Sequence, residues 1–334
     1  MTSQKLPFFN TEMDHALFLR YVGRNVENAK TLDLSECQYF PIALGKLAVL
    51  TRECCAVARL PELLGQLTAI TALHLRNCPA LTSLPESLGQ MAALNYLDLS
   101  VCRALTGLPE SLGRLAALAT LNLWACCALT GLPESLGRLT ALRTLDLYDC
   151  RALTGLPESL GQMAALRTLG IRACHVLTRL PESVGRLATL VTLNLSGCAF
   201  TKLPESLGRL AALKTLNISD CRALTGLPES LGQLTALTYL NLSQCFVLTR
   251  LPQSLSQLAA LTTLNLQMCY ALNFPPDFIV RQGAHAVMAF LLAHYHPLKI
   301  MILIMAARRR RMRRPPAELW DLILDQFYEV NLVI

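Results

Sequence analysis

The sequence contains few charged and aromatic residues and no long apolar run. Charged residues make up 16% of the 334 positions and aromatic residues 6%, whereas about a quarter of an average soluble protein is charged. No uninterrupted apolar stretch reaches the roughly 18 residues that a transmembrane helix needs, and the N-terminal segment lacks the apolar run of a secretory signal. We therefore expect no transmembrane segment, and a collagen, a coiled coil and a disordered chain are also disfavoured.

Positive charge is concentrated in one short segment. The net charge is +7, from 30 Lys and Arg against 23 Asp and Glu. Without the six clustered arginines, 24 basic residues stand against 23 acidic ones, so the rest of the chain is almost neutral. Because a general nucleic-acid surface needs positive charge spread over a face, we do not expect the body of the chain to bind nucleic acid. The clustered arginines are Arg308, Arg309, Arg310, Arg311, Arg313 and Arg314.

An internal repeat dominates the sequence. Nine Leu-Pro pairs recur at intervals of 24 residues, except for one interval of 23 between Pro181 and Pro204. Six of the nine copies read Leu-Pro-Glu-Ser-Leu-Gly. A period of this length indicates a solenoid, in which neighbouring units stack and share one core. The prolines are Pro61, Pro85, Pro109, Pro133, Pro157, Pro181, Pro204, Pro228 and Pro252.

Each repeat predicts a strand and a short helix. In Leu145-Asp146-Leu147, the alternation points both leucines into the core and Asp146 outward. Leucines three residues apart after each proline favour one or two turns of helix, with proline at the first helical position. Glu110 and Arg114 stand four residues apart in the order that favours an ion pair on a helix, and other units repeat this pair.

The unit L-x-x-L-x-L-x-x-C-x-x-L-T-x-L-P-x-x-L-G-x-L-x-x resembles the leucine-rich repeat family. The resemblance covers residues 31–293 and is to the 24-residue intracellular repeats of plant disease-resistance proteins, Ras-pathway scaffolds and bacterial effectors. It implies an α/β solenoid shaped as a curved horseshoe, with parallel strands on the concave face, short helices on the convex face and helical caps. It also implies an intracellular scaffold or receptor that binds proteins in signalling.

We expect one continuous unit with atypical ends, because the terminal repeats of a solenoid must cover its core. Residues 1–30 are predicted to form an N-terminal helical cap. The leucine-rich repeats span residues 31–273, of which 31–60 are degenerate. Residues 274–307 are predicted to form a C-terminal helical cap, and residues 308–334 hold the arginine run and an amphipathic helix.

Nine of the thirteen cysteines occupy the same position of the repeat. This ladder indicates a packing role, because a free cysteine behaves as a small buried hydrophobic residue. Disulfide frameworks occur instead in short, loop-rich secreted chains. We therefore predict reduced, structural cysteines and a cytoplasmic location. The ladder consists of Cys78, Cys102, Cys126, Cys150, Cys174, Cys198, Cys221, Cys245 and Cys269.

The sequence lacks recognisable catalytic motifs. It contains no glycine-rich phosphate loop of the Walker or Rossmann type, and its six histidines have no Cys or carboxylate at metal-ligand spacing. His294 and His296 lie beside Pro297 and are better explained as the end of a helix. We expect no enzymatic activity, no cofactor and no metal site.

The outward positions of the predicted strands form two columns of side chains. Both columns vary over the first five repeats and are nearly uniform Asn and Ser over the last four. Trp, Tyr and Arg are the residue types that most often supply hot spots in protein interfaces. Repeat drift without any partner is the alternative explanation. We predict a protein-binding site on the concave face around Arg76, Asp98, Trp124, Asp146, Tyr148 and Arg172.

Two alternative hypotheses concern the C-terminal segment. The arginine run resembles a nuclear-import or phosphate-binding stretch, which suggests RNA or anionic-membrane binding. A solvated linker or helix face is the simpler explanation. Residues 315–327 resemble the opening of an F-box, the module that docks ubiquitin-ligase adaptors, and would make the chain a substrate-recognition subunit of a ubiquitin ligase. An amphipathic helix packed on the cap is the simpler explanation. The candidate adaptor-docking residues are Pro316, Leu319, Trp320 and Ile323.

Overall fold

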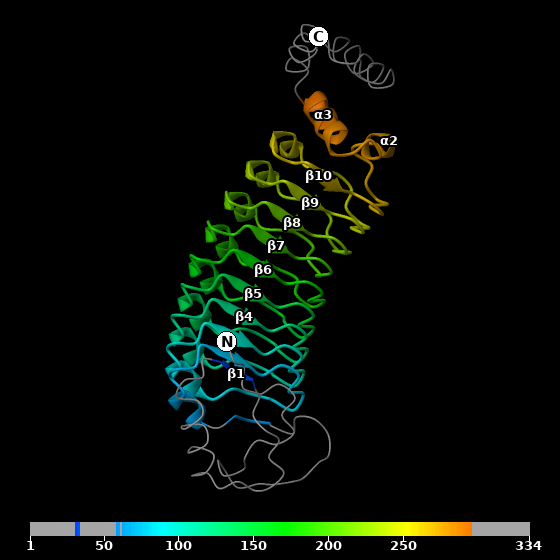
Figure 1. The fold of residues 1–334 in the computed structure, drawn as a ribbon. Coiled ribbons are helices and arrows are strands. Elements are labelled where there is room, and N and C mark those ends of the chain that lie inside the picture. Colours follow the sequence, from blue (N-terminus) through cyan, green and yellow to red (C-terminus); the bar gives the residue numbers. More distant parts are fainter. Residues whose placement is uncertain (1–30, 34–57, 61, 296–334) are drawn as a thin grey trace, which may run out of the picture.

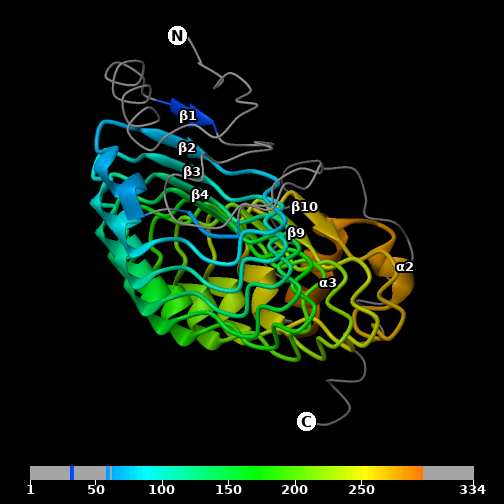
Figure 2. The same ribbon diagram turned by 90° about the horizontal axis from the view of Figure 1, so that it is seen from below.

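The protein is an elongated, curved array of stacked repeats. The computed structural model describes residues 31–33, 58–60 and 62–295. Within them, ten strands form a single parallel sheet in sequence order, and a five-residue 3₁₀ helix precedes each strand from the second onward. The strands line one side of the array and the 3₁₀ helices the opposite side (Figure 1 and Figure 2). This architecture confirms the predicted solenoid, with the strands on its concave face.

The elements repeat with constant length and register. Each strand pairs residue for residue with the strand one repeat away, so that Leu121, Leu145 and Leu169 are consecutive partners. The strands are β1 (Thr31–Asp33), β2 (Ala72–His74), β3 (Tyr96–Asp98), β4 (Thr120–Asn122), β5 (Thr144–Asp146), β6 (Thr168–Gly170), β7 (Thr192–Asn194), β8 (Thr215–Asn217), β9 (Tyr239–Asn241) and β10 (Thr263–Asn265). The 3₁₀ helices are η2 (Glu62–Gln66), η3 (Glu86–Gln90), η4 (Glu110–Arg114), η5 (Glu134–Arg138), η6 (Glu158–Gln162), η7 (Glu182–Arg186), η8 (Glu205–Arg209), η9 (Glu229–Gln233) and η10 (Gln253–Gln257).

The short helices differ from the expectation in where they begin. Pro109 has extended backbone geometry, with φ −69° and ψ 149°, and precedes η4 as its cap instead of being its first helical residue. The first bond of the turn runs from the Leu112 N–H to the Pro109 carbonyl oxygen, at 3.1 Å. This spacing of three residues is that of a 3₁₀ helix, which is favoured when only one tight turn must be made.

In seven of the nine short helices the glutamate accepts a hydrogen bond from the next repeat, and the predicted ion pair between Glu110 and Arg114 was wrong. Glu110 Oε2 accepts a hydrogen bond from the Ser135 backbone N–H at 3.3 Å, and none of the ion pairs of the described residues includes Arg114. In a 3₁₀ helix the residues three apart eclipse, so residues four apart no longer share a face. The carboxylate instead satisfies an amide at the start of η5 that would otherwise lack an acceptor.

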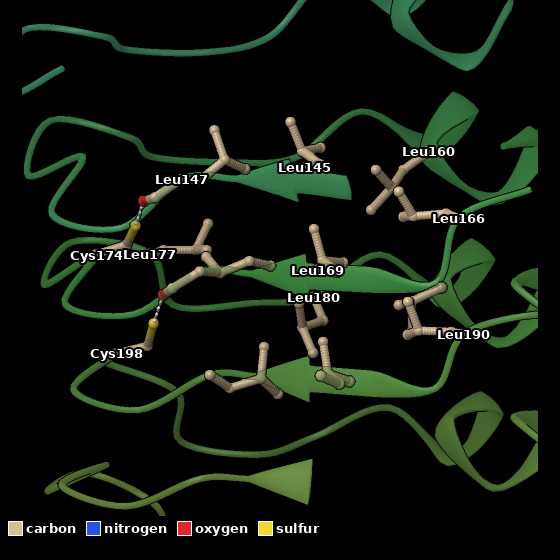
Figure 3. Packing of buried hydrophobic residues seen from close by; sticks show 14 of the residues in the cluster. Leu145, Leu147, Leu160, Leu166, Leu169, Cys174, Leu177, Leu180, Leu190 and Cys198 are labelled. Carbon is tan, nitrogen blue, oxygen red and sulfur yellow. Dashed lines mark hydrogen bonds between the residues drawn. The ribbon is translucent and has the colours of Figure 1, made fainter. Parts of the chain in front are cut away.

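The core is a continuous stack of leucine rows closed by the cysteine ladder. Leu145 and Leu147 are fully buried, as are their equivalents in neighbouring repeats (Figure 3). Cys174 Sγ lies 3.2 Å from the carbonyl oxygen of Leu147 and Cys198 Sγ 2.9 Å from that of Ile171. From Cys102 to Cys269 each ladder thiol donates in this way to the preceding repeat, and all nine ladder cysteines are buried.

Both ends of the described array depart from the repeat. At the N-terminal end, Leu32 of β1 pairs directly with Leu73 of β2, although they are 41 positions apart in the sequence. At the C-terminal end, α2 (Asp277–Val280) leads into α3 (Ala284–Tyr295), which packs against η10 and β10. The predictions for residues 1–30, for most of 31–60 and for 296–334 lie outside the described residues. Over the part that is described, no helix has the length and apolar character needed to cross a membrane.

Candidate protein-binding site

Four of the six predicted site residues form a row on the concave face. Trp124 and Tyr148 occupy the same position in neighbouring repeats, and their rings stack nearly parallel, with centroids 6.0 Å apart and 3° between the planes. The guanidinium carbon of Arg172 lies 5.1 Å from the centre of the Tyr148 ring. On the opposite side, that of Arg76 lies 5.8 Å from the centre of the Trp124 ring. We call Arg76, Trp124, Tyr148 and Arg172 the concave row.

Arg76 reaches Trp124 although a whole repeat lies between them. The intervening repeat carries Ser100 at this position, and its short side chain is 1% exposed. Repeats two apart are separated by roughly 10 Å, since neighbouring strands lie about 4.8 Å apart. The long arginine side chain spans this distance because Ser100 leaves the surface above it open. The concave row is therefore continuous over five repeats.

Asp98 and Asp146 stand beside the concave row but serve the loops of their own repeats. Asp98 Oδ1 accepts a hydrogen bond from the Ser100 N–H at 2.9 Å, and Asp146 Oδ1 accepts one from the Tyr148 N–H at 3.0 Å. Asn122 does the same for the Trp124 N–H at 3.0 Å. These are turns in which the side chain replaces a backbone acceptor. The observed role of both aspartates is thus to position the backbone of the column.

Asn122 is a positioning residue that the sequence reasoning missed. Its signal was present, because Asn or Asp recurs between the two strand leucines in most repeats. The same bond appears in the last four repeats, for example from the Ser219 N–H to Asn217 Oδ1 at 3.0 Å. The recurring acceptor therefore belongs to the fold, whereas Trp124 and Tyr148 are particular to their repeats.

The aspartate column also affects Tyr96, which lies next to the N-terminal end of the concave row. Burial raises the pKa of the Tyr96 phenol, and the negative charge of Asp98 raises it further, while Arg76 acts in the opposite direction. The ring of Tyr96 contacts that of His74, with centroids 5.0 Å apart. Tyr96 therefore remains protonated and neutral at physiological pH.

A second aromatic pair lies on the loop edge beyond the cysteine ladder, and sequence reasoning missed it. Phe246 and Tyr270 stack with centroids 5.8 Å apart and 6° between their planes, and Arg222 lies over Phe246 at 5.5 Å. Tyr270 is 75% exposed. We call Phe246 and Tyr270 the edge pair. Its signal was the aromatic residue directly after Cys245 and Cys269, which lies outside the two outward columns of the strands.

The other predicted sites belong to the C-terminal segment. The arginine run at 308–314 and the adaptor-docking residues Pro316, Leu319, Trp320 and Ile323 lie outside the described residues. Among the residues that are described, no three His, Cys, Asp or Glu side chains gather in a way that could hold a metal ion.

Comparison with known proteins agrees with the fold. Residues 134–278 match a family described as a leucine-rich repeat region. The leucine-rich repeat domain of the type III effector XopL is 27% identical over 77% of this chain and 85% of that chain, with a TM-score of 0.62. A leucine-rich-repeat protein of Leptospira interrogans is 25% identical over 75% of this chain and 81% of that chain, with a TM-score of 0.50. No curated protein sequence matches this chain.

The fold and these matches agree on the architecture. The array is a leucine-rich-repeat solenoid, an architecture that generally serves as a non-catalytic module for binding other proteins.

Proposed function

We propose that this protein is a non-catalytic scaffold or receptor that binds a protein partner on its concave face, centred on the concave row. The observation that carries the proposal is the stacked pair of Trp124 and Tyr148 with an arginine against each outer side. Interface hot spots are enriched in these three residue types and cluster near the centre of a binding surface. Catalysis is not part of the proposal, because the row offers no nucleophile beside a general base.

Folding does not require aromatic residues at these positions. The equivalent residues in the later repeats are Ser196, Ser219, Ser243 and Gln267. Those repeats keep the same strand register and the same side-chain acceptor for the loop amide. Since the solenoid forms equally well with serine there, the aromatic pair is better explained by recognition than by packing.

The test removes the aromatic pair and leaves the fold intact. Trp124→Ser with Tyr148→Ser should weaken partner binding by at least about 2 kcal/mol, the usual threshold for a hot spot. The measurement is quantitative mass spectrometry of proteins crosslinked to the full chain in cells that express it, together with the melting temperature of each purified variant.

The matched control removes a similar aromatic pair from another place. Phe246→Ser with Tyr270→Ser eliminates the edge pair, which has the same stacking and an adjacent arginine. Partners should be retained by this control and lost by the concave variant, with similar melting temperatures for both. Equal capture by the wild type and the concave variant would place the binding site elsewhere.

The two alternative functions remain predictions. A ubiquitin-ligase role depends on residues 315–327, and binding to RNA or anionic membranes depends on the arginine run, and both segments lie outside the described residues. A chain truncated after residue 307 tests both. Loss of an adaptor on truncation would favour the ligase, and unchanged partners would favour the simple scaffold.

A further inference from the structure

We propose that the partner places an acidic, extended segment of protein chain along the concave row, with carboxylates bound by Arg76 and Arg172. This inference rests on the proposed function and names the chemistry of its partner. It follows from what the row leaves available for contact, from the charges around it and from the spacing of its members.

The π faces of the concave row are already occupied. Trp124 and Tyr148 face each other, while Arg172 covers the outer side of Tyr148 and Arg76 that of Trp124. A partner therefore meets ring edges and guanidinium groups. The indole N–H and the phenol O–H lie at ring edges, and neither has a hydrogen-bond partner among the described residues. Since indole and guanidinium groups can only donate, the row presents mainly hydrogen-bond donors.

The concave row and its surroundings carry more positive than negative charge. Arg76 and Arg172 are exposed, and no carboxylate of the described residues pairs with either guanidinium. The neighbouring carboxylates of Asp98 and Asp146 each accept a backbone N–H and form no ion pair with Arg76 or Arg172. Exposed Arg143 and Arg167, which immediately precede β5 and β6, add further positive charge. Carboxylates are the complementary groups, because guanidinium binds them through two parallel hydrogen bonds.

The spacing of the row suits an extended chain. Its three steps measure 5.8, 6.0 and 5.1 Å. An extended chain advances about 3.3 Å per residue, so its alternate side chains recur every 6.6 Å or so. Two acidic residues roughly four to six positions apart can thus reach Arg76 and Arg172 together.

The same geometry disfavours single-stranded nucleic acid. Bases bind such proteins by stacking on open aromatic faces. Here both rings are covered on both sides by other members of the row. The observations therefore favour carboxylates on protein over phosphates on RNA.

The test uses Trp124 as its own reporter. The chain has two tryptophans, so a Trp320→Phe background leaves Trp124 as the sole emitter in the full-length protein. Titration with a decapeptide of glutamate should change the Trp124 emission and saturate, and added salt should weaken the binding. A decapeptide of lysine should have no effect. A serine decapeptide with glutamates at its third and eighth positions should compete better than one with two adjacent glutamates.

Paired arginine variants decide whether the row is the binding site. Arg76→Gln with Arg172→Gln should weaken decaglutamate binding about tenfold or more. Arg114→Gln with Arg138→Gln removes the same charge from exposed convex positions. This control should change the affinity for decaglutamate less than about twofold. If both double variants weaken decaglutamate binding equally, the binding depends only on net charge and the proposal is wrong.

Two other outcomes are informative. Decauridylate binding that is tighter than decaglutamate binding and depends on Arg76 and Arg172 would replace the acidic segment with RNA. If decaglutamate does not bind but the Trp124 and Tyr148 double variant still loses its protein partners, the acidic segment is wrong while the proposed function stands.

Discussion

The thiol of Cys245 donates a hydrogen bond to the backbone carbonyl oxygen of Ile218, with 3.2 Å between sulfur and oxygen. The two residues belong to consecutive repeats, so the bond ties the loop of one repeat to the strand end of the one before it. Cys150 and Leu123 repeat this contact at the same distance. The ladder therefore holds the repeats together through neutral thiols that act as donors.

This arrangement predicts that stability falls at alkaline pH. Burial raises the pKa of Cys221 and of Cys245 from 9.0 to about 12. Between these values the unfolded chain releases the thiol protons while the folded chain keeps them. Because the unfolded state then binds fewer protons, the free energy of unfolding should decrease as pH rises from about 9 to 12, by at most about 1.4 kcal/mol per pH unit for each thiol.

Urea unfolding at several pH values between neutrality and about pH 10 would measure this slope. Cys245→Ala should make it shallower, because the substitution removes one of the titrating groups. Below about pH 8 these thiols are protonated in both states and should contribute almost no slope. A free energy of unfolding that is constant across the alkaline range would contradict the prediction.

The ladder should also resist alkylation in the native protein. Its nine cysteines are buried, whereas Cys127 is half-buried and lies outside the ladder. Iodoacetamide should modify Cys127 well before any ladder cysteine, and denaturation should make the ladder reactive. Peptide mass spectrometry resolves the sites, and Cys127→Ser serves as the control. Native disulfides between ladder positions would refute the structural role.

Much of the fold and part of the site follow from the repeat period. A spacing of 24 residues places Trp124 directly beside Tyr148, because equivalent residues of stacked repeats are neighbours. The contact of Arg76 with Trp124 across Ser100 was not predictable, since it depends on the conformation that a long side chain adopts over a small one. The hydrogen bond of Glu110 to the next repeat could not be predicted either, because the sequence pattern does not distinguish a 3₁₀ turn from an α-helical one.

The bond from Glu110 to the next repeat predicts an asymmetry between two residues of η4. Glu110→Ala removes the acceptor of the Ser135 N–H and should lower the free energy of unfolding by about 0.5–2 kcal/mol, as for the loss of a helix cap. Arg114→Ala should change it by less than about 0.5 kcal/mol, because the arginine has an exposed side chain without an ion-pair partner among the described residues. Urea unfolding of both variants checks this, and equal losses would instead indicate a Glu110–Arg114 pair.

Val101 occupies a backbone conformation that suits a β-branched residue poorly. Its φ is +64°, and the equivalent positions include Asn77 at +58° and Gly197 at +70°. The left-handed region costs most residues about 1–2 kcal/mol, and Asn tolerates it better than Val. Val101→Asn should therefore raise the free energy of unfolding by about 1 kcal/mol. Val247→Asn, at an exposed valine with negative φ, is the control and should give no such gain.

Two glycines of neighbouring segments should respond in opposite ways to alanine. A Cβ on Gly137 would lie 2.4 Å from the carbonyl oxygen of Ser159 and 2.7 Å from its Cβ, whereas a Cβ on Gly131 would meet nothing within 4 Å. Ser159 lies in η6, held there by the hydrogen bond between its N–H and Glu134, so it cannot move aside without disturbing the next repeat. Gly137→Ala should lower the free energy of unfolding by about 1–3 kcal/mol through overpacking.

Gly131→Ala is the matched variant. The added methyl group meets open space, and alanine restricts the unfolded chain more than glycine does, so stability should stay constant or rise by up to about 1 kcal/mol. Both variants can be compared by urea unfolding under identical conditions. The same loss at both positions would show that conformational freedom, and not the close approach to Ser159, accounts for the glycine of η5. A loss at Gly137 alone would show that the glycine sets how closely neighbouring repeats stack on the convex side.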